Sequence, residues 1–492
     1  MSILTVIKNN TKEELPFEGT PLLDELLTRA GLLIPHPCGG RGVCGKCAVR
    51  ITGELSAPTE TERQHGTRLS CTTRLLGDAT LLWDTDERTM RIETNTAETI
   101  SPLMSPGAEG FGAAIDIGTT TVALKLYDLS DGRCIGTAAA PNPQTSIAAD
   151  VMGRIEAAMK GELTRLREMI TQTVTELLQQ ASPDRIPPMP LTVTVTGNTT
   201  MLYLLCGYDP TPLSRAPFVA DHLFGTELTL PQFPTPVYLP PCMNAFVGAD
   251  ITCAVLASGM CDRPETSLLC DIGTNGELAL WKDGHLYVTS TAAGPAFEGA
   301  GITCGCGSIT GAIDRVWVEN GQLRIHTIGD AAPAGLCGSG VIDAVAAGLQ
   351  LEEIDESGAM DEPLTLSDQV VLHPRDVRAV QLAKAAIAAG IDTLLEISHT
   401  APDQIDTFYI AGGFGSHLNQ ESAIAIGLLP NIPTDRIQIL GNAALHGAAM
   451  TLTDPTIRRQ LTHIAVLSQH INLGGNPRFS EHYIDRMIFG EE

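Results

Sequence analysis

The stretch FGAAIDIGTTTVALKLYDLSDG, residues 111–132, decides the fold because the chain repeats it as SLLCDIGTNGELALWKDG, residues 267–284. Each copy has an apolar strand, then Asp-Ile-Gly-Thr, a second strand of alternating polarity and a closing Asp-Gly turn. Asp116 and Asp271 stand at the same place in the two copies. This self-similarity predicts two related halves, each built on the same β-hairpin.

The turn of each copy has the composition of a phosphate-binding loop. A glycine lets the turn approach a phosphate closely, and threonine hydroxyls and backbone N–H groups donate to phosphate oxygens. A carboxylate at a strand end holds Mg²⁺, usually through water, so we predict that Asp116 and Asp271 position Mg²⁺ and water. The predicted phosphate contacts are Gly118, Thr119, Thr120 and Thr121 in the first loop and Gly273, Thr274, Asn275 and Gly276 in the second. Two such loops would hold a polyphosphate from both sides, whereas one alone is an ordinary hairpin turn.

A third segment, DTFYIAGGFGSHL at residues 406–418, leads an apolar strand into Gly412, Gly413 and Phe414. Glycines there allow close contact with a nucleoside, and the following helix offers its N-terminus. The three segments together resemble the actin-like ATPase superfamily, a duplicated ribonuclease H-like α/β fold that includes sugar kinases and heat-shock chaperones. The resemblance implies two phosphate loops and an adenosine loop at residues 412–414. It also implies a catalytic polar residue in the region of Gln144 and Asp150, with Gln144 as the predicted one. The alternative is a doubly wound fold without a nucleotide.

Near the N-terminus, PHPCGGRGVCGKC at residues 35–47 places Cys38, Cys44 and Cys47 close together, and Cys71 follows later. A tight cysteine cluster in a cytosolic chain indicates metal or redox chemistry. The flanking pattern is a strand at residues 2–7, a helix from residue 20 and a strand at residues 47–55. This order resembles a plant-type [2Fe–2S] ferredoxin with a β-grasp fold over residues 1–90. The first cysteine spacing is five residues where the plant-type pattern has four. The alternative is a structural zinc site.

Composition narrows the classes of partner. The 492 residues carry 57 acidic and 31 basic side chains, a net charge of −26, which repels nucleic acid and anionic lipid. No apolar run reaches the length of a membrane span, and the first residues lack the pattern of a signal peptide. We therefore expect a cytoplasmic protein. Cys304, Cys306 and Cys337 lie beside the predicted phosphate region and are interpreted as inert thiols, with a second cluster as the alternative.

The domain division follows from these segments. We predict a ferredoxin-type domain at residues 1–90, a polar linker at 91–110, a first actin-like subdomain at 111–265 and a second at 266–492. A ferredoxin domain joined to an actin-like module carrying GNTTM, AAGPAFEGAGI, CGSGVIDA, DVRAVQLAKAAI and AGGFGSHL resembles the reductive activators of corrinoid enzymes. Many members of that family carry a substantial domain between the two modules, where this chain has about 20 residues.

The resemblance implies an ATP-hydrolysing enzyme that returns one electron from a [2Fe–2S] cluster to the Co(II) corrinoid protein of a methyltransferase system, giving Co(I). It implies ATP and Mg²⁺ as further cofactors and an upstream low-potential electron donor. The sequence leaves open whether the protein is a homodimer. The alternatives are an activator of another low-potential enzyme, such as a radical dehydratase, or a nucleotide-dependent binding module with a simple electron-donor domain. A kinase is disfavoured because no segment identifies a phosphoryl acceptor.

Overall fold

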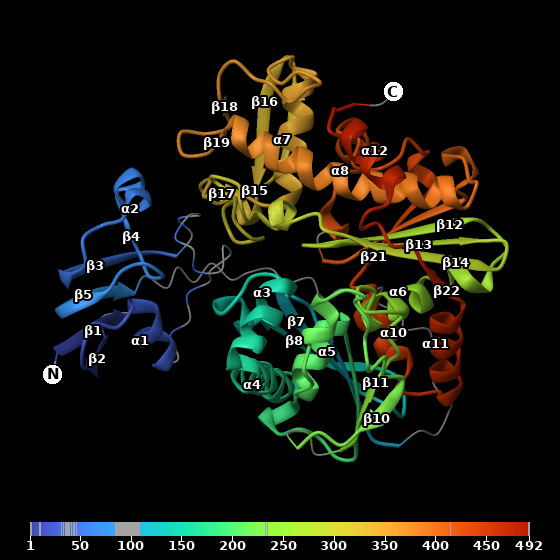
Figure 1. The fold of residues 1–492 in the computed structure, drawn as a ribbon, viewed down its shortest axis with the longest axis horizontal. Coiled ribbons are helices and arrows are strands. Elements are labelled where there is room, and N and C mark those ends of the chain that lie inside the picture. The colour runs from blue at the N-terminus through green and yellow to red at the C-terminus, as the bar shows by residue number, and fades with distance from the viewer. Residues whose placement is uncertain are drawn as a thin grey trace.

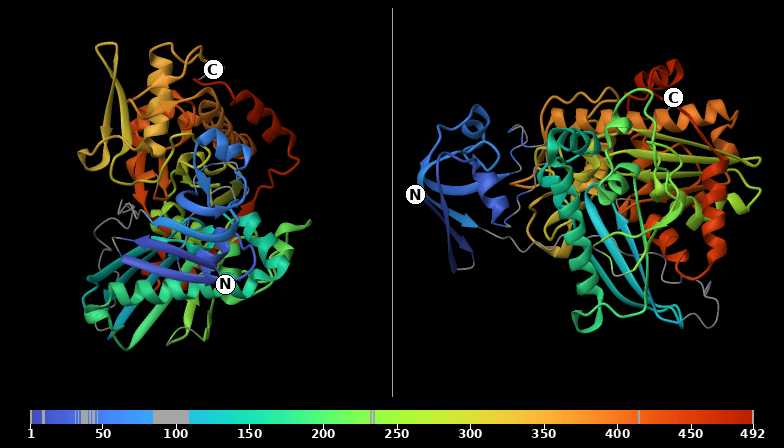
Figure 2. Two further views of the ribbon diagram at one scale, coloured as in Figure 1. Left: turned by 90° about the vertical axis from the view of Figure 1, so that its left-hand side faces the viewer. Right: turned by 60° about the horizontal axis from the view of Figure 1, so that its bottom comes forward.

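The computed structural model describes residues 2–8, 11–30, 32, 34, 40, 42, 45, 47–83, 109–231, 233, 235–413 and 415–490. A small N-terminal sheet lies at one end of the molecule, and two larger lobes lie together at the other (Figure 1). The two further views show the same separation of the small sheet from the lobes (Figure 2). Among the described residues, no helix is long and apolar enough to cross a membrane.

The N-terminal domain is a five-stranded sheet with the order β2-β1-β5-β3-β4. Its strands are β1 (Ser2–Lys8), β2 (Thr11–Phe17), β3 (Ala48–Leu55), β4 (Arg68–Leu69) and β5 (Leu75–Trp83), and its helices are α1 (Leu23–Arg29) and α2 (Glu60–His65). Leu23 and Leu27 of α1 are fully buried against Leu4 and Leu81 of the sheet. The parallel pairing of β1 with β5 beneath a packed helix is the β-grasp arrangement that the sequence predicts.

The first lobe is built on a six-stranded sheet with the order β10-β11-β9-β6-β7-β8. Its elements are β6 (Phe111–Ile117), β7 (Thr121–Asp128), β8 (Cys134–Pro141), α3 (Val151–Ala157), α4 (Leu163–Ala181), β9 (Leu191–Gly197), α5 (Thr199–Cys206), β10 (Thr226–Leu228) and β11 (Val237–Leu239). Leu166, Ile170 and Val174 recur at helical spacing along α4 and are buried against the sheet. One apolar face of α4 therefore covers this sheet.

The second lobe repeats the same plan, with the order β21-β20-β12-β13-β14-β22. Its strands are β12 (Ser267–Ile272), β13 (Gly276–Lys282), β14 (His285–Thr291), β20 (Thr407–Ala411), β21 (Ile437–Gly441) and β22 (Ser468–His470). In each lobe the first strand pairs antiparallel with the next strand and parallel with a later one, so Asp116 lies opposite Thr196 and Asp271 lies opposite Ala411. The prediction of two related halves is confirmed.

Three helices pack between the two sheets and join the lobes. They are α6 (Ala249–Ser258), α10 (Ala443–Met450) and α11 (Pro455–Leu467). Their buried side chains form one core cluster with Ala114 and Ala123 of the first sheet and with Leu269 and Ala279 of the second. Figure 1 shows α6 and α10 in the space between the sheets. Since α10 follows the second hairpin in the sequence, its packing against the first sheet links the two halves of the chain.

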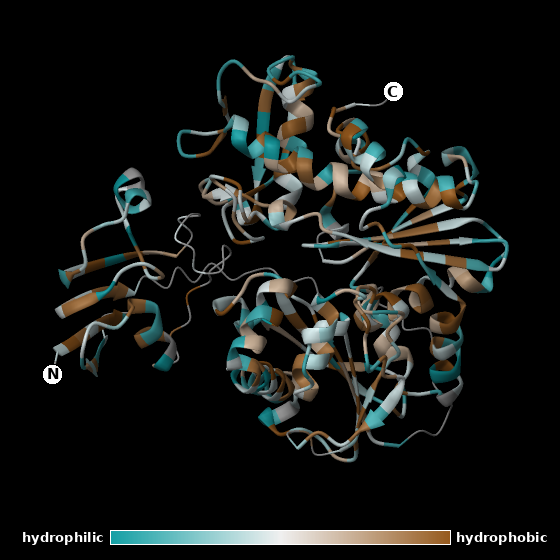
Figure 3. Ribbon diagram, viewed as in Figure 1, coloured by the Kyte–Doolittle hydropathy of each residue, from teal (hydrophilic) through white to brown (hydrophobic). Residues whose placement is uncertain are grey.

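A smaller set of elements extends from the second lobe. It comprises β15 (Ala312–Glu319), β16 (Gln322–Thr327), β17 (Gly335–Leu336), α7 (Gly338–Gln350), β18 (Leu364–Thr365), β19 (Val371–Leu372), α8 (Pro374–Ile397), α9 (Gln420–Ala425) and α12 (Pro477–Asp485). The long helix α8 has apolar residues that are buried on several faces. Figure 3 shows the hydrophobic residues concentrated in the central strands of both lobes, with hydrophilic residues on the outer helices.

Candidate functional site

A cavity of about 260 Å³ lies where the two repeated hairpins approach each other. Its walls include most of the loop residues that the sequence singles out: Asp116, Gly118, Thr119, Thr120, Thr121, Asp271, Gly273, Thr274, Asn275, Gly412 and Gly413. Segments far apart in the sequence therefore meet at one place, because each half contributes the same end of its sheet. The ligands that these residues bind remain a prediction.

Three predicted residues do not line this cavity or lie outside the described part of the chain. Gln144 is fully buried behind the first loop, where its amide nitrogen donates to Leu166 O (2.9 Å) and its amide oxygen accepts from Arg154 Nη1 (3.1 Å). Both ends of the Gln144 amide are thus used within the protein. Gly276 begins β13, where a Cβ would crowd the side chain of Ile387. Phe414 lies outside the described residues.

The first loop is held in place by hydrogen bonds from residues behind it. The Gly118 N–H donates to Thr121 O (2.9 Å), and Asn142 Nδ2 donates to Gly118 O (2.8 Å). Arg154, a fully buried arginine, donates from Nη2 to the carbonyl of Thr119. Burial lowers the pKa of Arg154 to about 9, against the attraction of Asp150 and Glu298. These contacts fix the backbone and leave the threonine side chains at the cavity.

The second loop is held by the segments beside it. The Gly273 N–H donates to Asn275 O (2.9 Å), and the Gly294 N–H donates to Thr274 O (2.9 Å). Gly412 has a φ of +87°, and a Cβ there would collide with Oδ1 of Asp271. Only glycine therefore allows the third segment to lie against this carboxylate.

Three acidic side chains of the cavity were not predicted. Asp250 is the second residue of α6, Glu277 pairs with Asp271 across the second hairpin, and Glu298 is the last residue of the short 3₁₀ turn Pro295–Glu298. The segment AAGPAFEGAGI contains Glu298 and was noted as a family motif, which was the available signal for it. Asp250 lies in an apolar helical run, and nothing in that run marks it as a cavity residue.

Four carboxyl groups of the cavity, those of Asp116, Asp250, Asp271 and Glu277, hold their protons more tightly than usual. Burial raises the pKa of Asp116 to about 6, although a hydrogen bond from Asn442 opposes the rise. Burial and the charge of Asp116 raise the pKa of Asp271 to about 7. Burial, followed by the charges of Asp116 and Asp271, raises the pKa of Asp250 to about 8. The pKa of Glu277 is raised well above its ordinary value by burial and by Asp250 and Asp271.

No lysine or arginine is among the described residues that line this cavity. The acidic side chains therefore repel a bare polyanion, and a divalent cation would offset that repulsion. Within the described part of the chain, no three His, Cys, Asp or Glu side chains are arranged to hold a metal ion by themselves. This arrangement fits Mg²⁺ that arrives with phosphate oxygens and water, because Mg²⁺ keeps several waters and takes few protein carboxylates.

Three helices begin at the cavity wall. Asn198 caps α5, Gly338 begins α7 and Asn442 caps α10, and each of these residues lines the cavity. The N-terminus of a helix carries a partial positive charge and free N–H groups, which favour phosphate. The cavity thus offers helix N-termini and loop hydroxyls for an anion, together with carboxylates for its cation.

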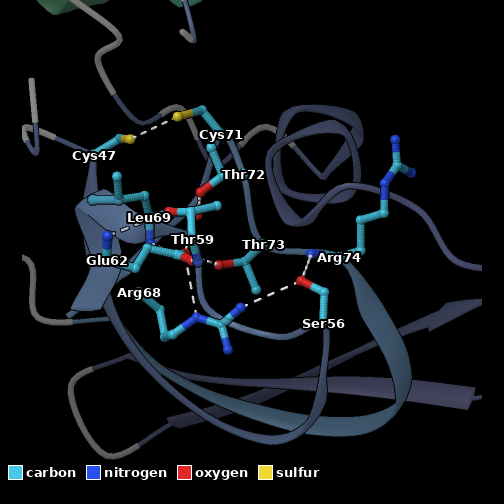
Figure 4. A network of polar contacts seen from close by, with 10 residues as sticks. All are labelled: Cys47, Ser56, Thr59, Glu62, Arg68, Leu69, Cys71, Thr72, Thr73 and Arg74. Atoms are coloured by element: carbon cyan, nitrogen blue, oxygen red, sulfur yellow. Dashed lines mark hydrogen bonds and ion pairs between the residues drawn. The ribbon is translucent and has the colours of Figure 1, made fainter. Parts of the chain in front are cut away.

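A second candidate site lies in the N-terminal domain. Cys47 is buried, and its Sγ lies 3.2 Å from Sγ of Cys71 (Figure 4). This separation is too long for a disulfide bond and fits two thiolates that bind one metal centre. Cys38 and Cys44 lie outside the described residues. Their predicted role as the other two ligands remains untested.

A buried carboxylate organises the turn that carries Cys71. Oε1 of Glu62 accepts from Leu69 N (2.9 Å), Thr73 Oγ1 (2.9 Å) and Thr72 Oγ1 (3.1 Å), while Oε2 accepts from Thr59 N (2.6 Å) (Figure 4). Burial alone would raise the pKa of Glu62, but these hydrogen bonds outweigh it and lower the pKa to about 2. Glu62 is therefore an anion that holds both sides of the Cys71 turn.

The three cysteines near the cavity do not form a metal centre among the described residues. Cys306 lines the cavity, whereas Cys337 is buried at the start of α7 with its Sγ 3.4 Å from Ser339 Oγ. Burial raises the pKa of Cys337. A buried protonated thiol of this kind is typical of an unreactive cysteine.

Comparison with known proteins gives matches along most of the chain. Residues 6–76 match the model of the 2Fe-2S iron-sulfur cluster binding domain, residues 111–263 match the RACo middle region, and residues 265–492 match the C-terminal domain of RACo, the ASKHA domain. The ASKHA match, together with the two equivalent sheets, confirms the actin-like fold predicted from the repeat.

Two curated relatives extend across both modules. The chain is 34% identical over 420 residues to the corrinoid activation enzyme RamQ of Eubacterium limosum, covering 77% of this chain and 70% of that protein. It is 25% identical over 423 residues to the [Co(II) methylated amine-specific corrinoid protein] reductase of Methanosarcina barkeri, covering 77% of each. A solved structure, the reductive activator for corrinoid,iron-sulfur protein, matches 99% of this chain and 98% of that one with 26% identity and a TM-score of 0.72.

Proposed function

The chain belongs to the RACo family of corrinoid activators, and from this premise we propose that it reduces the Co(II) corrinoid protein of a methyltransferase system to Co(I) at the expense of ATP. The observation that carries the proposal is the pairing of two sites in one chain. In the N-terminal domain, the thiols of Cys47 and Cys71 lie close enough to bind one metal centre. In the actin-like module, the two repeated hairpins line a cavity with the composition of a phosphate-binding site.

The cysteine site supplies the electron. A [2Fe–2S] cluster bound there provides a one-electron donor, which in plant-type ferredoxins has a potential near −400 mV. We assign its ligands to Cys38, Cys44, Cys47 and Cys71. Glu62 holds the Cys71 turn through hydrogen bonds to Leu69 and Thr73.

A nucleotide bound in the cavity supplies the free energy for electron transfer to an acceptor of lower potential. Moving an electron against 100 mV costs about 2.3 kcal/mol, so an acceptor below the cluster potential needs a second source of free energy. A nucleotide that binds one conformation better than another provides it. We propose that Asp116 and Asp271 position Mg²⁺ and water, and that the hydroxyls of Thr119, Thr120 and Thr274 donate to phosphate oxygens.

We also propose the finer points that accompany this function. The electron comes from an upstream low-potential donor, and the protein acts in the cytoplasm. The ferredoxin-type domain spans residues 1–90, with the two actin-like subdomains at 111–265 and 266–492. The boundaries of the matched families, at residues 76, 111, 263 and 265, support this division. The protein is a candidate homodimer, and light scattering of the full chain would measure whether its mass is that of one chain or two.

The decisive experiment is anaerobic and uses the full chain with its cluster reduced. It is mixed with a Co(II) corrinoid protein from the same organism, with and without Mg-ATP, and the absorbance of Co(I) is followed. We expect a rise that needs ATP. A flat trace with an intact and reducible cluster would contradict the proposal, and dehydratase-type acceptors would be the next to test.

A further inference from the structure

Glu298 joins the two loops of the cavity. Its Oε2 accepts a hydrogen bond from Thr120 Oγ1 over 2.5 Å, and its Oε1 accepts from Thr274 Oγ1 over 2.7 Å. Thr120 lies in the turn between β6 and β7, and Thr274 lies in the matching turn between β12 and β13. One carboxylate therefore bridges the two halves of the molecule at the centre of the proposed nucleotide site.

These two hydroxyls are the groups predicted to donate to phosphate. A hydroxyl has one hydrogen to donate, so it cannot donate to Glu298 and to a phosphate oxygen at the same time. The carboxylate and a phosphate group are also both anionic, and close like charges repel strongly away from bulk water. Phosphate contact with Thr120 and Thr274 thus requires Glu298 to leave.

Glycines flank the segment around Glu298 on both sides. Gly294, Gly299 and Gly301 on either side of it all have positive φ values, of 80°, 76° and 82°. Between them Phe297 is 1% exposed and anchors the turn in the core of the second lobe. The backbone of Gly299 also lies tightly against Cys306, because a Cβ there would collide with the Cys306 backbone. A displacement of Glu298 that moves Gly299 would therefore also move the backbone of Cys306.

From Cys306 the contacts continue away from the cavity. The Cys306 N–H donates to Leu336 O (2.8 Å), immediately before α7. Thr303 donates from its N–H and its hydroxyl to Oδ1 of Asp376 (2.7 and 2.8 Å), in the first turn of α8. The segment after Glu298 thus contacts the residue before the N-cap of α7 and the first turn of α8.

We propose that Glu298 is a stand-in for phosphate that keeps the two loops joined in the nucleotide-free protein, and that its displacement by the nucleotide transmits binding to residues 299–306. The proposal rests on nucleotide binding by this cavity, as set out under the proposed function. Glu298 is a positioning residue in this scheme, acting through Thr120 and Thr274.

The test is a double-mutant cycle with the full chain and its cluster. The dissociation constants of Mg-ADP and of a non-hydrolysable ATP analogue are measured for wild type, Glu298→Ala, Thr274→Val and the double variant. Removing the competing carboxylate should tighten binding by about three- to tenfold, the range of one hydrogen bond. In the wild-type background, Thr274→Val should weaken nucleotide binding little, because it also removes the hydrogen bond that holds Glu298 in the site. In the Glu298→Ala background, the same substitution should weaken binding about three- to tenfold.

The cycle separates the proposal from its rivals. If Thr274→Val weakens nucleotide binding by the same factor in wild type and in Glu298→Ala, the two side chains are not coupled. Any effect of Glu298→Ala would then be a general effect of charge, and the proposal would be overturned. Weaker binding by Glu298→Ala would overturn it as well, because Glu298 would then hold the nucleotide or its cation. Glu319→Gln, which removes an exposed partner of Arg324, is the control for a distant loss of charge. If wild type binds no nucleotide at all, the proposed function fails instead.

A second readout tests the transmission itself. Hydrogen exchange of residues 299–306 is measured with and without Mg-ADP. In wild type we expect faster exchange with nucleotide, since the bridge that holds the segment is broken. In Glu298→Ala the segment should exchange fast in both states. Exchange that does not respond to nucleotide in wild type would overturn this part of the proposal.

Discussion

Asn442 donates a hydrogen bond from Nδ2 to Oδ2 of Asp116 over 3.0 Å, joining the start of α10 to the end of β6. The same side chain accepts from Leu445 N (2.8 Å) and so caps α10. Since α10 packs between the two sheets, one asparagine aligns a helix of the interlobe layer with a predicted Mg²⁺-positioning carboxylate. The hydrogen bond lowers the pKa of Asp116 against the effect of burial.

Substitution of Asn442 should separate these two roles. Asn442→Ser keeps a capping hydroxyl, whereas Asn442→Ala removes the cap and should lower the free energy of unfolding by about 1 kcal/mol. Both variants remove the hydrogen bond to Asp116, so its pKa rises above about 6 and Mg-nucleotide binds more weakly near neutral pH. Urea unfolding and equilibrium binding measure the two effects. Unchanged binding by both variants would show that Asp116 does not need this contact.

Asp271→Ala should abolish ATP-dependent reduction of the corrinoid protein and leave the absorption spectrum of the cluster unchanged. The reason is that Asp271 lies in the actin-like module, at the cavity, and the cysteine site is in another domain. Asp283→Ala, at the exposed turn of the same hairpin, is the matched control and should retain activity. A fully active Asp271→Ala protein would remove our assignment of the second loop.

Cys71→Ala should lose the cluster while nucleotide affinity is retained. The thiol of Cys71 faces that of Cys47, and both are predicted ligands of the cluster. Cys134→Ala removes an exposed cysteine of the first lobe and is the control. Iron content, visible absorption and the dissociation constant of Mg-ADP give the result. Loss of iron and nucleotide binding together would mean that the two sites are not independent.

Glu62→Gln should weaken the N-terminal domain and release iron faster than wild type. The amide keeps the shape of the carboxylate but cannot accept the backbone N–H groups of Leu69 and Thr59 on both its ends. A buried donor left without a partner costs about 1–3 kcal/mol. Thermal unfolding of the domain and iron release to a chelator are the measurements, with Glu60→Gln on the exposed face of α2 as control. Equal iron release by both variants would contradict this role.

The free energy of unfolding of the metal-free protein should fall as pH rises, because of the carboxyl groups in the cavity. Asp116 and Asp271 have pKa values of about 6 and about 7, against an ordinary value of 3.8. The folded state therefore binds their protons more tightly than the unfolded state, and the free energy of unfolding decreases from about pH 4 up to about pH 8. Each group contributes at most about 1.4 kcal/mol per pH unit in this window.

Mg²⁺ should reverse that loss, and most strongly at the upper end of the window. Urea unfolding at pH 5.5 and pH 8, with and without Mg²⁺, measures both effects. Asp250→Asn removes the neighbour whose charge is repelled by Asp116 and Asp271, so its stability should depend less on pH. Equal pH dependence of wild type and Asp250→Asn would show that the three carboxyls do not titrate together.

The sequence predicted the parts of the site that follow from repetition. Asp116 and Asp271 were found because each ends the first strand of a repeated hairpin, and such a repeat survives in the chain as a readable pattern. Strand β2 was missed because TKEELPF alternates poorly and is mostly exposed at the edge of its sheet. Local pattern is weak where only pairing with a neighbour stabilises a strand.

The rest of the site depends on tertiary contacts that no local pattern encodes. Asp250 reaches the cavity because α6 packs between the sheets, and Glu298 reaches it because two glycine turns direct it there. Gln144 is a related case: its place in the chain predicts a catalytic role, which stays a prediction, and both ends of its amide form hydrogen bonds within the protein, to Leu166 and Arg154. Residues brought in from helix ends and connecting turns were therefore the ones that sequence reasoning missed.

The two six-stranded sheets share an order over five strands, β11-β9-β6-β7-β8 and β21-β20-β12-β13-β14, while the loops at their ends differ. Two identical halves would present identical loops to a nucleotide, which would then bind in two equivalent orientations. Within one chain the copies have diverged, so that the first loop reads Gly-Thr-Thr-Thr and the second reads Gly-Thr-Asn-Gly. A duplicated architecture whose two loops differ in sequence accepts an asymmetric ligand in one orientation.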